Sequence, residues 1–371
     1  MHITLDYLLT TFLIITLLTI SISTVYVISF NPISYNKGSQ LREIAERTLD
    51  KILLTDGYPP NWGSDFHITS ENLSDFGLHL QNASMYVLDS DKVSRLHPGI
   101  NETLRMDPMK VAELLGLSEN GILKYGFSLR IKPYLNITIQ DVGTDYFKIT
   151  VRKYDGSIAA GARVKAIYII ANINETSGRI SNITWGFNYL ETNIQGICYL
   201  NLSSLSTEES QYFCLIIYAD YLQFESATIH VASSTTNDTK VAPGLQLQAS
   251  RGHLTPLIAG EWGSGYFVAI TSDSITAVQI TKPSGGLANF TLYDAGLDPN
   301  TQFIIAVLNK GSGEANFYVL SGSRPLCTSQ SPVIFETSEP GGFEVCSITR
   351  YVTINDLTYV VEFYIWPMSS A

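Results

Sequence analysis

Charged side chains are scarce in this sequence, and their scarcity already narrows the class of protein. Lys, Arg, Asp and Glu make up 15% of the 371 residues, against roughly 25% in an average soluble domain. The net charge is −11, which argues against binding to a phosphate backbone, because such binding needs clustered Lys and Arg. Hydrophobic residues make up 45%, so the chain has ample material for a core and intrinsic disorder is excluded.

Motifs that would indicate catalysis or metal binding are also missing. The histidines are scattered, and no His-Glu-x-x-His, P-loop or Rossmann fingerprint occurs. Gly263-Ser264-Gly265 lacks the flanking glycines of a nucleophile elbow. The pair Asp89 and Asp91 lacks the Gly and terminal Glu of a calcium loop, so we expect solvated turn acids there. We predict no enzyme, no catalytic residue, no cofactor and no metal.

What is present at the N-terminus is an uncharged run. No charged residue lies between Asp6 and Lys37. The stretch from Tyr7 to Phe30 would span about 36 Å as a helix, enough for the hydrocarbon core of a bilayer. A cleavable secretory signal is disfavoured, because no Lys or Arg precedes the run and the run is too long. The sequence therefore predicts a long hydrophobic helix that crosses the membrane once.

This predicted helix is rich in Ser and Thr, and two interpretations stay open. The hydroxyls satisfy carbonyls of their own helix, or the helix packs closely against copies of itself. The second interpretation makes the N-terminal segment an assembly helix. Its candidate assembly residues are Asp6, Tyr7, Phe12, Thr16, Thr19, Ser23, Tyr26 and Phe30.

An amphipathic helix is predicted next, from Ser39 to Thr55. Its apolar positions form one stripe, which consists of Leu41, Ile44, Ala45, Leu49, Ile52 and Leu53. Pro32 and Gly38 separate it from the first helix. We expect the two helices to form one kinked stalk over residues 1–55.

The remaining chain changes from a mixed pattern to a β pattern. Residues 56–124 form a small mixed α/β region, with short helices at Asp91–Leu96 and Pro108–Leu117. Strands such as Thr184–Leu190 and Tyr212–Tyr218 recur at the spacing of a β-sandwich over 125–232, and a polar linker follows at 233–240. Further strands over 241–371 predict a C-terminal sandwich. The predicted fold is a long N-terminal hydrophobic α-helix, a small α/β region and two mainly antiparallel β-sandwich domains, α+β overall and mostly β.

Potential N-glycosylation sites are unusually frequent after residue 55. Asn-x-Ser/Thr sequons begin at Asn72, Asn82, Asn101, Asn136, Asn174, Asn182, Asn201, Asn237 and Asn289. Their number favours an exterior location. Flanking charge instead predicts that the bulk of the chain is cytoplasmic, because Lys37, Arg42 and Arg47 follow the predicted membrane helix and nothing basic precedes it. We place the bulk of the chain outside the cell.

The four cysteines fall into two pairs in the sequence. Cys198 and Cys214 form one pair, and Cys327 and Cys346 the other. Their spacings suit strands joined through a loop, so two disulfides in an oxidising compartment are predicted. Four reduced cysteines in the core are the alternative.

Three features of the N-terminal third occur together: the uncharged helix from Tyr7, the block from Ala45 to Gly63 that ends Gly-Tyr-Pro-Pro-Asn-Trp-Gly, and a set of short matches. The short matches are Phe76–Leu78, Leu88-Asp89 with Lys92-Val93, Leu114–Leu117 and Tyr125–Phe127. With these features the N-terminal third resembles archaeal pilin-like surface proteins, the group with class III, prepilin-type N-termini. The resemblance implies that the helix sits in the membrane before assembly and in a filament core afterwards. Asp6 would stand for the early Glu of mature pilins and pair with the α-amino group of a neighbouring copy.

Residues 145–232 look like an immunoglobulin-like or transthyretin-like repeat domain. The similarity lies in Asp155–Ala162 and Thr192–Ile197. Together the resemblances imply a structural subunit of an archaeal pilus-like filament at the cell surface, with glycosylated β-domains outside, for adhesion or surface contact. Its partners would be copies of itself, the membrane before assembly, N-linked glycans and an unknown surface or host ligand, but no nucleic acid. A single-pass, membrane-anchored adhesin, receptor or envelope component that does not polymerise is the alternative.

Overall fold

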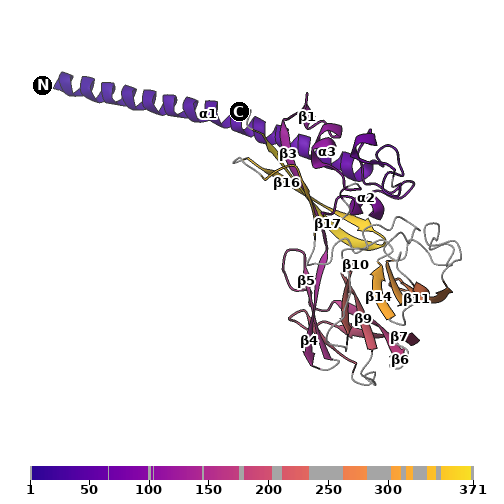
Figure 1. The fold of residues 1–371 in the computed structure, drawn as a ribbon. Coiled ribbons are helices and arrows are strands. Elements are labelled where there is room, and N and C mark those ends of the chain that lie inside the picture. The colour runs from indigo at the N-terminus through magenta and orange to yellow at the C-terminus, as the bar shows by residue number, and fades with distance from the viewer. Residues whose placement is uncertain are drawn as a thin grey trace.

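Antiparallel β-sheets make up most of the body of the protein, and one long helix projects from that body (Figure 1). The architecture comes from a computed structural model. It describes residues 2–65, 67–98, 102, 104–143, 146–174, 179–202, 211–233, 262–281, 302–310, 315–320, 332–339 and 344–368. The body is the described chain that follows this helix.

The projecting helix, α1, spans His2–Leu54. It continues through Pro32 and Gly38, so the stalk that we expected to be interrupted there is one helix. Three short helical elements follow, which are η1 (Ser70–Asn72), α2 (Ser90–Ser94) and α3 (Pro108–Leu114). Asp89 caps α2 by accepting from the backbone N–H of Asp91 at 2.9 Å, and Asp107 caps α3 in the same way. The two predicted short helices are confirmed, each ending two or three residues earlier than predicted.

A four-stranded sheet packs directly against the C-terminal part of α1. Its order is β15-β3-β17-β16, and β16 and β17 contact the helix. The strands are β3 (Tyr125–Pro133), β15 (Val333–Glu336), β16 (Cys346–Ile354) and β17 (Leu357–Pro367). β3 thus shares one sheet with strands that lie about 200 residues later in the chain. A two-stranded ribbon of β1 (Ser118–Glu119) and β2 (Ile122–Leu123) lies just before β3 in the chain.

Seven strands beyond β3 form a sandwich of two sheets. The three-stranded sheet has the order β4-β5-β8, and the four-stranded sheet has the order β10-β9-β6-β7. Their bounds are β4 (Leu135–Gly143), β5 (Tyr146–Lys153), β6 (Arg163–Asn174), β7 (Arg179–Glu191), β8 (Ile197–Asn201), β9 (Gln211–Tyr221) and β10 (Phe224–Ser233). Alternating side chains such as Ile149, Leu200 and Ile217 fill the space between the sheets. The predicted strands Thr184–Leu190 and Tyr212–Tyr218 are confirmed within β7 and β9.

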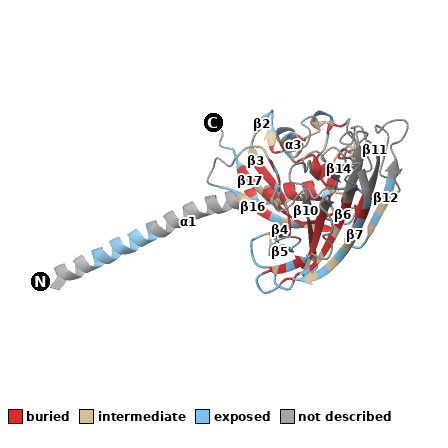
Figure 2. Cartoon of the chain, turned by 60° about the horizontal axis from the view of Figure 1, so that its bottom comes forward, coloured by how far each residue is buried: buried red, intermediate tan, exposed pale blue. Residues whose placement is uncertain are grey.

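A fourth sheet covers the other face of β10-β9-β6-β7. It has the order β12-β11-β13-β14, with β11 (Trp262–Ile270), β12 (Ile275–Thr281), β13 (Phe303–Lys310) and β14 (Ala315–Leu320). Phe303 meets the ring of Tyr218 edge-on, with centroids 5.9 Å apart. Figure 2 shows buried residues running through the body.

The predicted fold class is wrong in two respects. First, no helix in the described part of the chain is long and apolar enough to span a membrane, so the expected long hydrophobic helix is not found. The uncharged run and the charged segment after it belong to one element, α1. Second, residues after 241 do not fold as a separate sandwich, because β15 and β17 pair with β3 on its two edges. Alternation predicts that a strand exists but does not identify its partner.

Candidate functional site

The feature of α1 that most needs explanation is an exposed apolar segment, residues 10–22. Its large apolar side chains lie in solvent, with Phe12 71%, Ile15 60% and Leu17 61% exposed. Successive residues of a helix are about 100° apart, so the four consecutive side chains from Phe12 to Ile15 point to all sides. Figure 2 shows this segment well away from the body. An exposed apolar surface that surrounds a helix indicates a site that something else covers.

Two hydroxyls of this segment are already satisfied within the helix. Thr16 Oγ1 donates to the carbonyl of Phe12 at 2.5 Å, and Thr19 Oγ1 donates to that of Ile15 at 2.7 Å. For Thr16 and Thr19, the structure therefore agrees with the first interpretation, in which the hydroxyls satisfy carbonyls of their own helix. Their small size still lets another helix approach closely.

The predicted assembly residues lie at different places along α1. Phe12, Thr16 and Thr19 are in the exposed apolar segment. Asp6, Tyr7, Ser23, Tyr26 and Phe30 also fall within the bounds of α1, but their side chains lie outside the described residues. Their predicted role in assembly, including the pairing of Asp6, stays a prediction.

The other end of α1 is held in the body. Leu41, Ala45, Leu49, Ile52 and Leu53 are buried, and Ile44 packs partly buried beside them. The stripe predicted from the sequence is therefore confirmed. Each fully buried Leu or Ile contributes about 1.5–3 kcal/mol through removal from water. This burial fixes the helix to the sheet β15-β3-β17-β16 and to the segment that follows it.

That segment, residues 55–65, 67–98 and 104–117, wraps the end of α1, and we call it the collar. Trp62 is fully buried within it and donates from Nε1 to the carbonyl of Gly77 at 3.1 Å. Gly57 has a φ of +70°, and a Cβ there would lie 2.8 Å from the carbonyl oxygen of Asp75. The loop Gly57–Gly63 therefore needs glycine at its start and Trp62 at its core. This loop is the end of the block Ala45–Gly63, one of the three features that carry the pilin-like resemblance.

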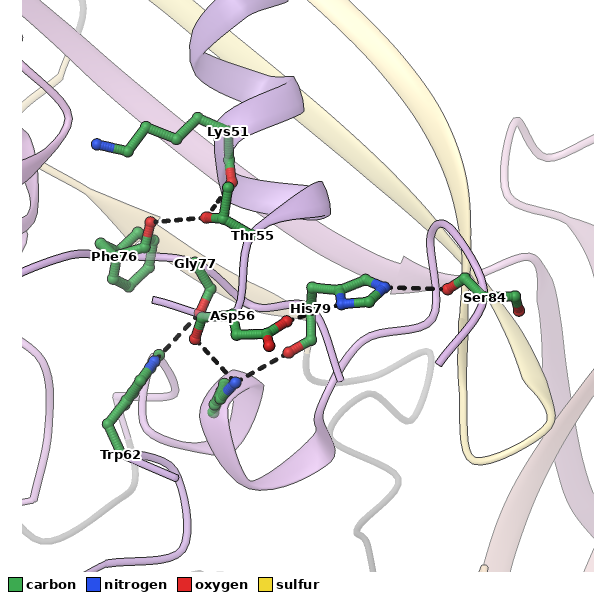
Figure 3. Close-up of polar contacts among 9 residues, drawn as sticks. Lys51, Thr55, Asp56, Trp62, Phe76, Gly77, His79 and Ser84 are labelled. Atoms are coloured by element: carbon green, nitrogen blue, oxygen red, sulfur yellow. Dashed lines mark hydrogen bonds and ion pairs between the residues drawn. The ribbon is translucent and has the colours of Figure 1, made fainter. Parts of the chain in front are cut away.

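Polar side chains join α1 to the collar, and Figure 3 shows one of them, Thr55, bonded to the carbonyls of Lys51 and Phe76. Lys51 Nζ donates to the carbonyl of Leu114 at 2.8 Å and pairs with Asp75 Oδ1 at 3.0 Å. Thr55 Oγ1 caps the helix by donating to the carbonyl of Lys51 at 2.7 Å. The helix end is thus held on two sides.

A second polar group lies deeper in the collar. Lys92 is fully buried, and its Nζ donates to the carbonyls of Asp56 and His79, each at 2.9 Å. The ring of His79 lies between Asp56 Oδ1 at 2.8 Å and the carbonyl of Ser84 at 3.1 Å, as Figure 3 shows. Buried charge is costly unless it is hydrogen-bonded. The two bonds of Lys92 satisfy its charge and join α2 to the segments that contain Asp56 and His79.

Arg95 plays the same part for the remaining loops. It is buried, and its guanidinium donates to the carbonyls of Trp62 and Ile68, and to that of Leu104 at 2.7 Å. Burial lowers the pKa of Arg95 to about 10, against a smaller opposing effect of Asp65. The group therefore stays charged at neutral pH. Because these cations donate to backbone carbonyls, their arrangement stabilises the collar.

Asp91 differs from its prediction as a solvated turn acid. It is buried in α2, next to the cap residue Asp89. Among the described residues, no three side chains of the metal-binding types gather as a group that could hold an ion. The sequence analysis also missed Lys92 and Arg95, because an isolated Lys or Arg in a polar segment resembles a solvated surface residue.

Four sequons expose their asparagine on the body. Asn72, Asn82, Asn182 and Asn201 are exposed. Asn136 is only half-exposed in β4, and its Oδ1 is buried without a hydrogen-bond partner. The side chains of Asn101, Asn174, Asn237 and Asn289 lie outside the described residues. Glycosylation at the four exposed positions stays a prediction that their geometry permits.

The predicted disulfide between Cys198 and Cys214 is not formed. Both are buried free thiols. Cys198 in β8 faces the interior of the sandwich with Leu200, whereas Cys214 in β9 faces the opposite side, toward the sheet β12-β11-β13-β14. Successive residues of a strand alternate between faces, so the sequence separation alone did not decide the geometry. Cys346 is also a free thiol, and its predicted partner Cys327 lies outside the described residues.

Comparison with known proteins identifies no relative. No protein-family model, no curated protein and no solved structure matches this chain.

Proposed function

We propose that this protein is a structural subunit of an extracellular, pilus-like filament of the archaeal type. In this assembly the exposed apolar segment of α1 packs against the same segment of neighbouring copies. The β-sheet body lies on the outside of the filament and carries the glycans. Adhesion or surface contact would be the task of the body.

The observation that carries the proposal is that the segment is apolar on all sides. A helix that pairs with one partner needs only a stripe, whereas a helix surrounded by several copies needs apolar side chains in every direction. Eight large apolar side chains are exposed: Phe12, Leu13, Ile14, Ile15, Leu17, Leu18, Ile20 and Ile22. Covering them would contribute on the order of 10 kcal/mol per subunit.

The collar supports the same proposal from the other end of α1. A subunit that enters a regular assembly has to present its helix at one fixed angle to its body. Lys51 and the buried stripe hold the helix end against the body. The four exposed sequons lie on the body, away from the segment that would be covered.

The test replaces one apolar side chain of the segment with a charge. Ile15→Asp should abolish sheared filaments, because each subunit would have to bury a carboxylate among apolar neighbours. Ile194→Asp is the matched control, since Ile194 is 86% exposed in the turn between β7 and β8 of the body. Negative-stain microscopy with an antibody to the body measures filament yield. Equal yields from both variants, or wild-type label found only on membranes, would contradict the proposal.

A further inference from the structure

Two tyrosines lie together on the outer face of the sheet β4-β5-β8. Tyr146 opens β5 and Tyr199 is in β8, and their rings are stacked with centroids 5.6 Å apart and planes 10° apart. They are 38% and 48% exposed, whereas their sequence neighbours Phe147 and Leu200 are buried in the sandwich. A pair of parallel aromatic rings left in solvent is a surface suited to a flat, partly apolar ligand.

Asn201 lies beside this pair on the same face. The register of β5 and β8 places Tyr146 directly opposite Asn201, and directly opposite residues point to one face with Cβ atoms about 4.5–5.5 Å apart. Tyr199 precedes Asn201 by two positions in β8, so it also shares that face. Asn201 is exposed and begins the sequon Asn-Leu-Ser.

We propose that the glycan linked to Asn201 folds back and that its first sugar rings lie on Tyr146 and Tyr199. The C–H bonds on one face of a pyranose are weakly positive, and the face of an aromatic ring is negative, so the two attract. The covalent link holds the sugar next to the rings at high effective concentration, and no independent affinity is required. Lys148, opposite Tyr199, and Gln140, opposite Lys148, lie in the next row and present polar groups to the sugar hydroxyls.

The linkage is an ordinary N-glycosidic bond. Asn201 Nδ2 bonds to the anomeric carbon of a sugar on a lipid-linked phosphate donor. The bond from that carbon to the phosphate oxygen breaks, the lipid phosphate leaves with the electron pair, and the proton lost from Nδ2 balances the charge of the departing phosphate. The proposed contact forms after this step. It does not depend on the proposed function of the filament.

Another sequon shows why the exposed pair matters. Asn136 also follows a tyrosine by two positions. That tyrosine, Tyr134, is buried, however, and its ring packs 4.2 Å from the ring of Phe224. Tyr134 is therefore covered by the protein itself. Of these two sequons, only Asn201 therefore has exposed tyrosine rings beside it that a sugar could contact.

The experiment is a double-substitution cycle on the full-length chain, purified from a host that adds N-linked glycans. Tyr199→Thr, Asn201→Gln and the combination are compared with wild type by thermal unfolding. Tyr199→Thr removes the stacking of Tyr199 on Tyr146 in both backgrounds. With the glycan present, it should lower the equilibrium constant for folding roughly fivefold more than it does in the Asn201→Gln background, because the contact of the ring with the sugar is lost as well. Tyr146→Thr should behave in the same way.

Two controls make the coupling specific. Tyr189→Thr changes an exposed tyrosine on β7, in a different sheet, and its effect should be the same with and without Asn201→Gln. Asn72→Gln removes an exposed sequon on the collar, and it should not change the effect of Tyr199→Thr. Glycopeptide mass spectrometry of the wild type should show a glycan on Asn201. An unmodified Asn201, or equal effects of Tyr199→Thr in both backgrounds, would overturn the proposal.

Discussion

Replacing Gly77 with alanine should weaken the packing of the collar against the C-terminal end of α1. A Cβ at this position would lie 2.0 Å from the carbonyl oxygen of Thr55 and 2.2 Å from its Oγ1, where non-bonded heavy atoms need about 3.5 Å. To relieve these two contacts, the backbone would have to move by roughly 1 Å or more. Two hydrogen bonds depend on this approach, from Leu78 N to the carbonyl of Ile52 at 2.8 Å and from His79 N to that of Thr55 at 3.0 Å.

The expected loss of stability follows from these contacts. Overpacking a tight site costs about 1–3 kcal/mol, and each weakened hydrogen bond adds up to about 1 kcal/mol. We therefore expect Gly77→Ala to lower the free energy of unfolding by about 2–4 kcal/mol. Amide hydrogen exchange should quicken in residues 41–54 of α1, because the helix end would open more readily.

Chemical denaturation and hydrogen exchange measure these two effects on the same protein. Gly143→Ala is the matched control, because the nearest atom to its Cβ would be the Cβ of Tyr146 at an ordinary 3.9 Å. If Gly77→Ala were as stable as Gly143→Ala, or if exchange at residues 41–54 were unchanged, the role of the collar would be refuted.

Three further predictions concern buried polar groups. Burial, followed by three nearby carboxylates, raises the pKa of Glu225 to about 7. Because the folded state binds the proton more tightly, the free energy of unfolding should fall as pH rises from about 4.5 through 7. Glu225→Gln should make the stability less dependent on pH over this range, as measured by thermal scans at several pH values. Cys198 and Cys214 should not react with a maleimide in the folded protein, because burial raises the pKa of both thiols. Both should react after the protein is unfolded without reductant. A disulfide-linked pair of peptides that contain Cys198 and Cys214 would contradict this prediction. Lys92→Met should lower the free energy of unfolding by about 1–3 kcal/mol, because two buried carbonyls lose their hydrogen-bond donor. The control is Lys110→Met, which removes the partly exposed Lys110–Glu113 pair. An equal loss of stability in both variants would refute the reasoning.

Local features could be predicted from the sequence because they depend on neighbours along the chain. The stripe from Leu41 to Leu53 follows from helical periodicity. The start of α3 follows from Asp107, which caps it, and from the proline that comes next. The period-2 pattern likewise located β7 and β9.

Features that depend on distant parts of the chain could not be predicted. Val361 of β17 lies opposite Ile131 of β3, and nothing in either strand specifies the other. The face on which Cys214 lies depends on which sheets cover β9 on its two sides. The collar cations Lys92 and Arg95 are buried only because loops far apart in the sequence meet around them.

The central claim is that the exposed apolar segment of α1 is covered by copies of itself. A photo-crosslinking benzoylphenylalanine in place of Phe12, which is 71% exposed, tests this claim in filament preparations of the full-length chain. After irradiation, mass spectrometry should identify crosslinked peptides that join residue 12 to α1 of another copy. Crosslinks that lead only to the body of the protein, or the absence of any crosslink between copies, would contradict the account.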